Sequence, residues 1–293
     1  MSAIDPVLSG PVAPAVGAGP RLERLRGLDP LLVGSLAVCL VLVALALLGP
    51  ALAPHSPTAT SILNANLGSS SEHLLGTDQL GRDLASRILA GARLSLTGPL
   101  VVVLISAGAG STLAIAGVWV GGAFERVSVR VIDVLFAFPS LLFAILAVAV
   151  FGTGFLAPVL ALSLAYTPYM ARVVRSVARR ERDLPYVDAG RLGGLSSWRI
   201  CTRHILPNVA PVILAQATIA FGGALIDLAA ISFIGLGVQP PKTEWGLMVA
   251  DGTTALLNGF PRQAVSAGVM IIVTVVAFNV LGERLARRAE LRR

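Results

Sequence analysis

The feature that most constrains this chain is a series of apolar stretches, each about as long as a bilayer is thick. A membrane-crossing helix needs about 20 consecutive residues that are mostly apolar. Hydrophobic residues make up 55% of the sequence and charged residues only 13%, against about 25% charged in a typical soluble domain. We therefore predict an all-α membrane protein with six transmembrane helices, at residues 30–53, 94–121, 131–151, 155–174, 209–236 and 264–281.

The basic residues predict which side of the membrane each segment occupies. Six spans place both termini on the same side. If that side is the cytoplasm, 18 of the 23 Lys and Arg residues lie in cytoplasmic segments, as the positive-inside rule requires. We predict a multi-pass protein of the cell membrane with both termini in the cytoplasm. The same rule accounts for the net charge of +7 without a nucleic-acid partner.

The spans divide the rest of the chain into tails and loops. Residues 1–29 are rich in Pro, Gly and Ala and are expected to form a disordered cytoplasmic tail. Residues 285–293 are expected to form a basic cytoplasmic tail, and residues 94–284 a core of five spans. Residues 54–93 and 237–260 are predicted to lie outside. Three arginines of the first outside segment, Arg82, Arg87 and Arg93, run against the charge rule, which indicates a local role that the sequence does not identify.

The loop at residues 175–208, between the fourth and fifth spans, is the most distinctive part of the core. Asp183 is expected to cap a short helix over residues 186–192, with Pro185 in its first turn. Glycines 193 and 194 are expected to end this helix, since glycine accepts the left-handed conformation found there. Ser196 or Ser197 is then expected to cap a second helix.

This loop is predicted to be a docking surface for a cytoplasmic partner. Eight arginines lie between residues 172 and 203, and the small side chains of Ala189 and Gly190 leave room for another surface to approach. A DNA-binding helix-turn-helix would have a similar helical pattern. The two membrane spans that flank the loop argue against that reading.

The same residues resemble the signature loop of bacterial ATP-binding-cassette (ABC) importer permeases, whose pattern is E-A-A-x3-G-x9-I-x-L-P. The positions that correspond to the pattern are Asp188, Ala189, Gly190, Gly194, His204, Leu206 and Pro207. Asp188 replaces the glutamate, Gly190 replaces the second alanine and His204 replaces the isoleucine.

Two further stretches are similar to the C-type permease of dipeptide, oligopeptide and nickel importers. Residues 75–96 begin LGTDQLGRD and end GARLSL, and they resemble the segment before the second span of that subfamily. Residues 232–246 contain SFIGLGVQPP followed by EWG, and they resemble its last outside loop. With the signature loop, the resemblance extends over residues 30–288.

The resemblance implies the transmembrane domain of a type I importer that moves peptides, either dipeptides or oligopeptides. A nickel chelate or another small solute stays open as the substrate. The expected partners are a homologous B-type permease, two cytoplasmic ATPase subunits and an extracytoplasmic solute-binding protein. The residues expected to couple to the ATPases are Tyr186, Asp188, Ala189, Gly190, Gly194, Trp198, Leu206 and Pro207.

Motifs for chemistry are missing from the sequence. It has no G-x-x-x-x-G-K-[ST] phosphate-binding loop, so we expect no enzyme activity and no cofactor bound by this chain, with ATP and Mg²⁺ on partner subunits. The three histidines, His55, His73 and His204, are far apart in the sequence, and we expect no metal site. An intramembrane enzyme is disfavoured because no catalytic constellation is recognisable.

Polar residues within spans are candidates for lining a transport path, because charge in lipid is costly. Asp227 is the first candidate, and it could instead pair with a partner. In an alternative function, a stand-alone proton-coupled carrier, Asp227 would be the coupling carboxylate. Gln216 and Asn279 are expected to form hydrogen bonds between helices.

Overall fold

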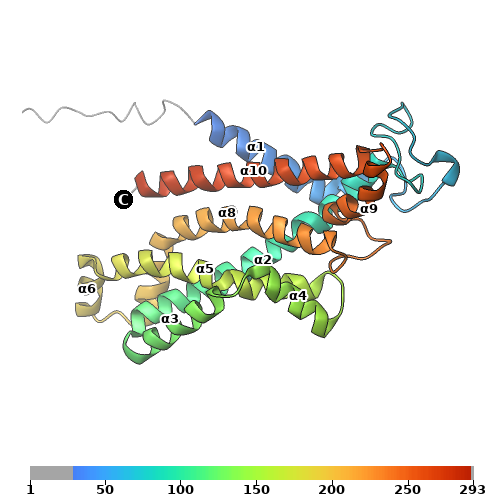
Figure 1. The fold of residues 1–293 in the computed structure, drawn as a ribbon. Helices are drawn as coiled ribbons and strands as arrows, with labels where there is room; N and C mark the ends of the chain where they lie inside the picture. The colour runs from blue at the N-terminus through green and yellow to red at the C-terminus, as the bar shows by residue number, and fades with distance from the viewer. Residues whose placement is uncertain (1–28, 292–293) are drawn as a thin grey trace, which may run out of the picture.

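The computed structural model describes residues 29–291, so all but the last residue of the predicted tail 1–29 lies outside the described part. The described residues form a bundle of helices (Figure 1). In chain order the longer helices are α1 (Pro30–Leu52), α2 (Leu84–Val120), α3 (Gly122–Phe136), α4 (Ser140–Phe151), α5 (Leu156–Arg182), α8 (Leu206–Phe233), α9 (Trp245–Leu257) and α10 (Arg262–Leu291). The shorter ones are η2 (Ile62–Asn64), α6 (Pro185–Leu192), α7 (Ser197–Ile200) and a π-helical turn, η3 (Cys201–Ile205).

The predicted all-helical membrane fold is confirmed, but the count of six spans is not. Within residues 29–291, four helices are long and apolar enough to cross a membrane: α1, α2, the continuous helix from α7 through α8, and α10. A bent helix pair, α3 with α4, raises the number to five. The fourth predicted span forms α5, which is long but carries Tyr, Thr and Pro residues among its apolar ones.

The third predicted span, residues 131–151, is broken rather than straight. α3 ends at Phe136, α4 begins at Ser140, and the two axes differ by 81°. Pro139 is the N-cap of α4. A residue before proline avoids the helical conformation, so Phe138 cannot continue α3. The sequence analysis did not predict this bend, because apolar residues lie on both sides of it.

α2 begins ten residues before the predicted start at residue 94. The Asp83 side chain caps the helix by accepting a hydrogen bond from the Ser86 backbone N–H at 2.8 Å. Ile88, Ala92 and Leu96 of the first turns are buried. Helix α10 also exceeds its prediction and continues to Leu291, so most of the segment separated as a tail from residue 285 is helical.

α1 and α10 run side by side, and the C-terminal end of α10 lies at the same end of the bundle as the start of α1 (Figure 1). Arg284 of α10 donates to the Asp29 carboxylate at 2.8 Å. Asp29 is in turn the N-cap of α1 and accepts from the Leu31 N–H. This ion pair joins the two helices at one end of the bundle.

α2 and α5 pack closely against each other. Gly110 lies against the α5 backbone, where a β-carbon would come within 2.9 Å of the Thr167 carbonyl oxygen and the Ala171 nitrogen. Only glycine allows the two backbones to come this close. The crossing therefore fixes α5, and with it the loop that follows α5, against the centre of the bundle.

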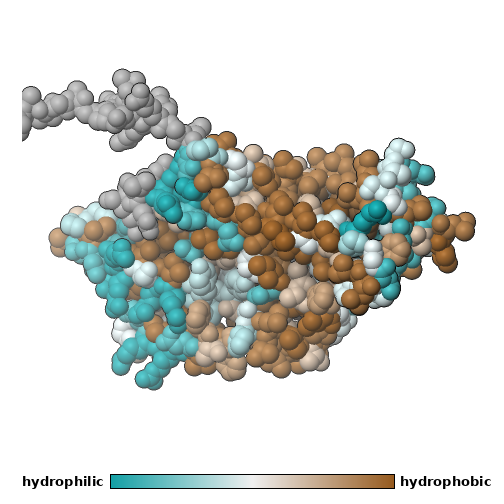
Figure 2. Space-filling model, turned by 45° about the horizontal axis from the view of Figure 1, so that its top comes forward, coloured by the Kyte–Doolittle hydropathy of each residue, from teal (hydrophilic) through white to brown (hydrophobic). Residues whose placement is uncertain are grey.

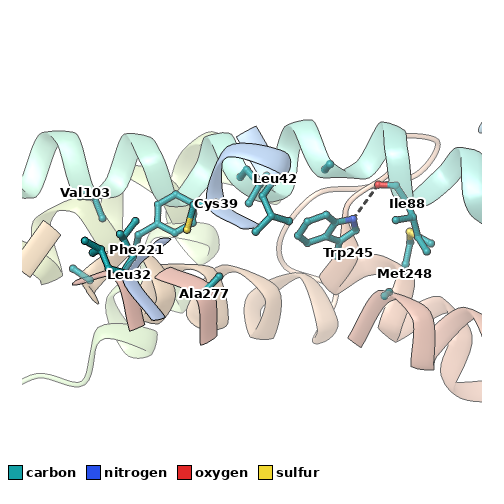
Figure 3. Packing of buried hydrophobic residues seen from close by; sticks show 14 of the residues in the cluster. Leu32, Cys39, Leu42, Ile88, Val103, Phe221, Trp245, Met248 and Ala277 are labelled. Carbon is teal, nitrogen blue, oxygen red and sulfur yellow. Dashed lines mark hydrogen bonds between the residues drawn. The ribbon is translucent and has the colours of Figure 1, made fainter. Parts of the chain in front are cut away.

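α9 was not predicted as a helix. It lies within the predicted outside segment 237–260 and starts at Trp245, a fully buried residue. Figure 3 shows Trp245 beside Leu42, Ile88 and Met248, with its indole N–H donating to the Ile88 carbonyl at 3.1 Å. α9 therefore packs as part of the core.

Candidate functional site

The predicted docking loop lies at one end of the bundle, where α5 ends and α6 turns back (Figure 1). Hydrophilic residues gather at this end, whereas apolar residues cover the middle of the molecule (Figure 2). The short helix α6 and the start of the α7–α8 helix form its outermost part. Gly194 separates them with a φ of +76°, which is the left-handed conformation that was predicted.

The local prediction of this loop was correct except for one cap. Pro185 occupies the first turn of α6, and the Ser196 side chain caps α7 by accepting from the Arg199 N–H. Asp183 does not cap α6. Leu184 takes that position, because a residue before proline is held extended. Asp183 instead accepts from Arg182 at 3.1 Å.

A small apolar cluster holds the inner side of the loop. Val187, Ile200 and Ile205 are each 1% exposed. They pack with Val174 and Val209 of the adjoining long helices. Burial of these side chains joins α6, α7 and η3 into one unit, so the loop is attached to α5 and to α8 at the same time.

Polar contacts reinforce this attachment. The Tyr186 hydroxyl donates to Glu181 of α5 at 2.9 Å and accepts from the Asn208 amide of α8 at 3.1 Å. Arg191 lies over the Trp119 ring at 4.6 Å, which connects α6 to the end of α2. α6 is therefore fixed against three long helices.

The outer side of the loop exposes large apolar side chains to the surroundings. Leu192 is 90% exposed and Trp198 is 78% exposed. Asp188 and Ala189 are exposed as well, and Gly190 is partly buried. Leu206 and Pro207, at the start of α8, are also exposed. The predicted docking residues thus share one end of the molecule, and most of them face outward.

Several of the loop's arginines pair with α3, which the sequence did not indicate. Arg175 donates to Glu125 at 2.7 Å, and Arg172 donates to Asp133 at 2.8 Å. Arg182 donates to the Val118 carbonyl at the end of α2. Arg172 and Arg175 therefore hold α3 against α5, whereas Arg182 joins α5 to α2.

The three polar residues predicted within spans take part in helix–helix contacts. Asp227 of α8 accepts from the Ser140 hydroxyl of α4 at 2.9 Å and from the Tyr166 hydroxyl of α5 at 3.2 Å. Gln216 accepts from the Tyr169 hydroxyl at 2.7 Å. Asn279 lies on Gly222, where a β-carbon would be 3.0 Å from its amide nitrogen.

A hollow of about 400 Å³ lies between α3, α4, α5 and α8. Ser140 and Tyr166, the two residues that bond Asp227, line this hollow, and Phe136 and Gly223 line it as well. Asp227 therefore lies beside an indentation of the bundle.

At the opposite end, a buried charge network explains two of the three unassigned arginines. Arg82 Nε and Arg87 Nη1 each donate to the same oxygen of Asp78 at 2.6 Å. Arg87 also contacts Asp251 of α9 at 3.4 Å. The network ties residues 78–87 to α9, whereas Arg93 is exposed. The signal in the sequence was the presence of these arginines in an outside segment. The sequence did not identify the partner Asp251, which is 164 residues from Arg87.

Another acid at this end, Glu244, caps α9 from a buried position. Its carboxylate accepts from the Gly246 and Leu247 N–H groups at 2.8 and 2.9 Å. Burial raises the pKa of Glu244 above its usual value, although these hydrogen bonds act in the opposite direction.

Residues 106–293 match the family described as "Binding-protein-dependent transport system inner membrane component". The chain belongs to this family. It is 38% identical over 273 residues to a protein of Brucella suis biovar 1 named as a peptide transport system permease, covering 93% of this chain and 90% of that one.

Other relatives have related names. A protein of Escherichia coli K12, DdpC, named as a D,D-dipeptide transport system permease, is 35% identical over 265 residues, covering 90% of this permease and 89% of the relative. The glutathione transport system permease protein GsiD of Pectobacterium atrosepticum is 40% identical over 220 residues, covering 75% and 73%.

The fold also matches a solved ABC importer. A chain of the inward-facing MetNI methionine ABC transporter superposes with a TM-score of 0.56 at 16% identity, covering 69% of this chain and 96% of that chain. The fold is therefore that of an ABC importer transmembrane subunit, as the sequence predicted. The chain is a multi-pass permease component of such a transporter.

Proposed function

We propose that this permease is one half of the membrane channel of an ATP-driven importer that carries peptides. The other half would be a homologous B-type permease. Two ATPase subunits, with ATP and Mg²⁺, would bind at the α6 end, which would lie in the cytoplasm together with both termini. A solute-binding protein would deliver substrate at the α9 end.

The observation that carries the proposal is the exposed apolar tip of a rigid loop. Leu192 of α6 and Trp198 of α7 are 90% and 78% exposed, and large exposed apolar groups near one another mark interaction sites. Beneath them, α6 is fixed to α5 and α8 by the buried cluster around Val187. An ATPase that gripped the tip would therefore move the two long helices.

Peptides are favoured as the substrate by the names of the relatives, which are a peptide, a D,D-dipeptide and a glutathione transporter permease. These substrates all contain peptide bonds. Nickel chelates and other small solutes remain the alternative class. Uptake of labelled dipeptide and of ⁶³Ni²⁺ by the reconstituted complex would separate the two classes.

The docking proposal is tested by changing Leu192 to serine. Burial of a leucine side chain contributes about 1.5–3 kcal/mol, so its loss should weaken co-purification of the ATPase subunits at least about tenfold. The matched control is Leu257→Ser, since Leu257 is 83% exposed at the opposite end. Equal ATPase retention by both variants would refute docking at α6.

A further inference from the structure

Three potential metal ligands that are far apart in the sequence meet at the α9 end of the molecule. His55 follows α1, His73 lies in the loop before α2, and Asp83 is the N-cap of α2. One ring nitrogen of each histidine and one carboxylate oxygen all lie within 4.8 Å of one another. We expected no metal site because the histidines are far apart in the sequence, but the fold brings His55 and His73 together.

The distances suit a single transition-metal ion. His73 Nδ1 lies 3.0 Å from Asp83 Oδ1, and His55 Nδ1 lies 3.9 Å from Asp83 Oδ2. Histidine nitrogen and carboxylate oxygen bind zinc at about 2.0–2.2 Å, so two ligands of one ion lie no more than about 4.4 Å apart. Small side-chain rotations would bring all three donors onto one ion.

The state of each group points to a ligand as well. His55 Nδ1 is buried and has no hydrogen-bond partner, an arrangement that is rare because an unpaired buried nitrogen is costly. The backbone N–H of His55 donates to the Ser86 hydroxyl at 3.0 Å, which holds the residue beside Asp83. The rings of His55 and His73 lie 5.0 Å apart, centre to centre.

The Asp83 carboxylate is held in place by the Ser86 backbone N–H, which donates to it at 2.8 Å, and by the Ser86 hydroxyl, which donates to it at 2.7 Å. The side chain of Asp83 is 1% exposed and that of His73 is 9% exposed, whereas that of His55 is 39% exposed. The cluster is thus closed on one side and open to solvent at His55, which gives an ion a route of entry.

A simpler interpretation is a hydrogen bond from His73 to Asp83 that holds the loop to the start of α2. That bond accounts for two of the three groups. It does not account for His55, whose ring lies against the same carboxylate with its buried nitrogen unpaired.

We propose that His55, His73 and Asp83 bind one divalent transition-metal ion of the zinc class, with water in the fourth position. Two imidazoles and a carboxylate are a common ligand set for zinc. The ion would clamp residues 54–83 onto the N-terminus of α2. This structural role is independent of the transport function and of its substrate.

The test uses the full chain in detergent, purified with a tag that contains no histidine. After removal of metals with a chelator, the protein receives Zn²⁺ and is separated from free ion, and its metal content is measured by mass spectrometry. We expect about one ion per chain for the natural sequence. We expect His55→Ala to bind at least about tenfold more weakly. The matched control is His204→Ala, which removes the third histidine at the other end and should leave binding unchanged.

Cobalt provides a second measurement. Co²⁺ bound by nitrogen and oxygen ligands in a four-coordinate site should give visible absorption bands without the near-ultraviolet band of a cobalt–thiolate bond. A thiolate band would place the ion at Cys39 or Cys201 and overturn the proposal. Equal Zn²⁺ binding by His55→Ala and the natural chain would overturn it too, as would loss of binding in His204→Ala. Because His55 is partly exposed and its ring makes no hydrogen bond, its removal should leave the fold intact.

Discussion

Replacing Asp78 by asparagine should be the most damaging single change in the charge network that joins α2 to α9. Asp78 is 1% exposed and accepts from both Arg82 and Arg87 at 2.6 Å. Removal of one partner from a buried ion pair costs about 3–5 kcal/mol, because the remaining charge is left unpaired. Two guanidinium groups share this carboxylate, so we expect a loss near the upper end of that range.

Two comparisons make this prediction specific. Asp251→Asn removes a carboxylate that is 25% exposed and lies 3.4 and 3.8 Å from the arginines, so its expected cost is only about 1 kcal/mol. The double variant Asp78→Asn with Arg87→Met removes one of the unpaired cations. It should therefore recover about 2 kcal/mol relative to Asp78→Asn alone.

The assay heats each variant in detergent and measures, by fluorescence-detected size-exclusion chromatography, the fraction that stays monodisperse. The expected order of midpoint temperatures is natural chain, Asp251→Asn, double variant and then Asp78→Asn. If Asp78→Asn and Asp251→Asn had the same midpoint, the argument from burial would be wrong. A double variant less stable than Asp78→Asn would also refute it.

Three further predictions concern single residues. Gly194→Val forces a φ of +76° on a branched residue, at a cost of about 1–2 kcal/mol. This change should reduce the amount of substrate transported per ATP hydrolysed. Gly190→Ala is the control that should be tolerated, because its β-carbon would meet only the side chains of Leu195 and Ile200, at 3.4 Å or more. Asp227→Asn should leave the pH dependence of transport unchanged, whereas a flattened profile would support a proton-coupled carrier. Because the pKa of Glu244 is raised in the folded state, its folded form binds the proton more tightly, and the stability of the natural chain should fall relative to Glu244→Gln as pH rises from about 4.3. Thermal unfolding of both proteins at several pH values checks this, and a difference in stability between the natural chain and Glu244→Gln that did not change with pH would contradict it.

The spans that the sequence predicted best are those whose apolar runs are continuous. α1 and α8 begin and end within three residues of their predicted bounds. The early start of α2 was missed because a charged residue such as Arg87 indicates a segment outside the membrane when only its sequence neighbours are considered. Its charge is compensated mainly by Asp78 and also by Asp251 on α9, and both contacts depend on the folded chain. Pro139 could have indicated the break in the third predicted span, but the apolar residues on both sides of it suggested a continuous helix.

The docking loop was predictable because its signals are local. A proline at a helix start, a glycine turn and a serine cap act over a few residues, and Pro185, Gly194 and Ser196 behave as expected. The cluster of His55 and His73 with Asp83 could not be predicted in this way. It depends on the path of the loop between α1 and α2, which no short motif describes.

The helix formed by α7, η3 and α8 runs without interruption from Ser197 to Phe233, 37 residues, or about 55 Å at 1.5 Å per residue. Its first turn carries the exposed Trp198, and near its far end Ala229 touches Gly246 of α9 so closely that a β-carbon there would lie 2.6 Å from the Ala229 backbone. A helix of this length can tilt as one rigid body, so that its two ends move in opposite directions. A tilt of about 5° around its middle would move each end by about 2 Å in opposite directions, given that length. A push on one face of the membrane would then reach the other face within a single element, with no relay of side chains between them.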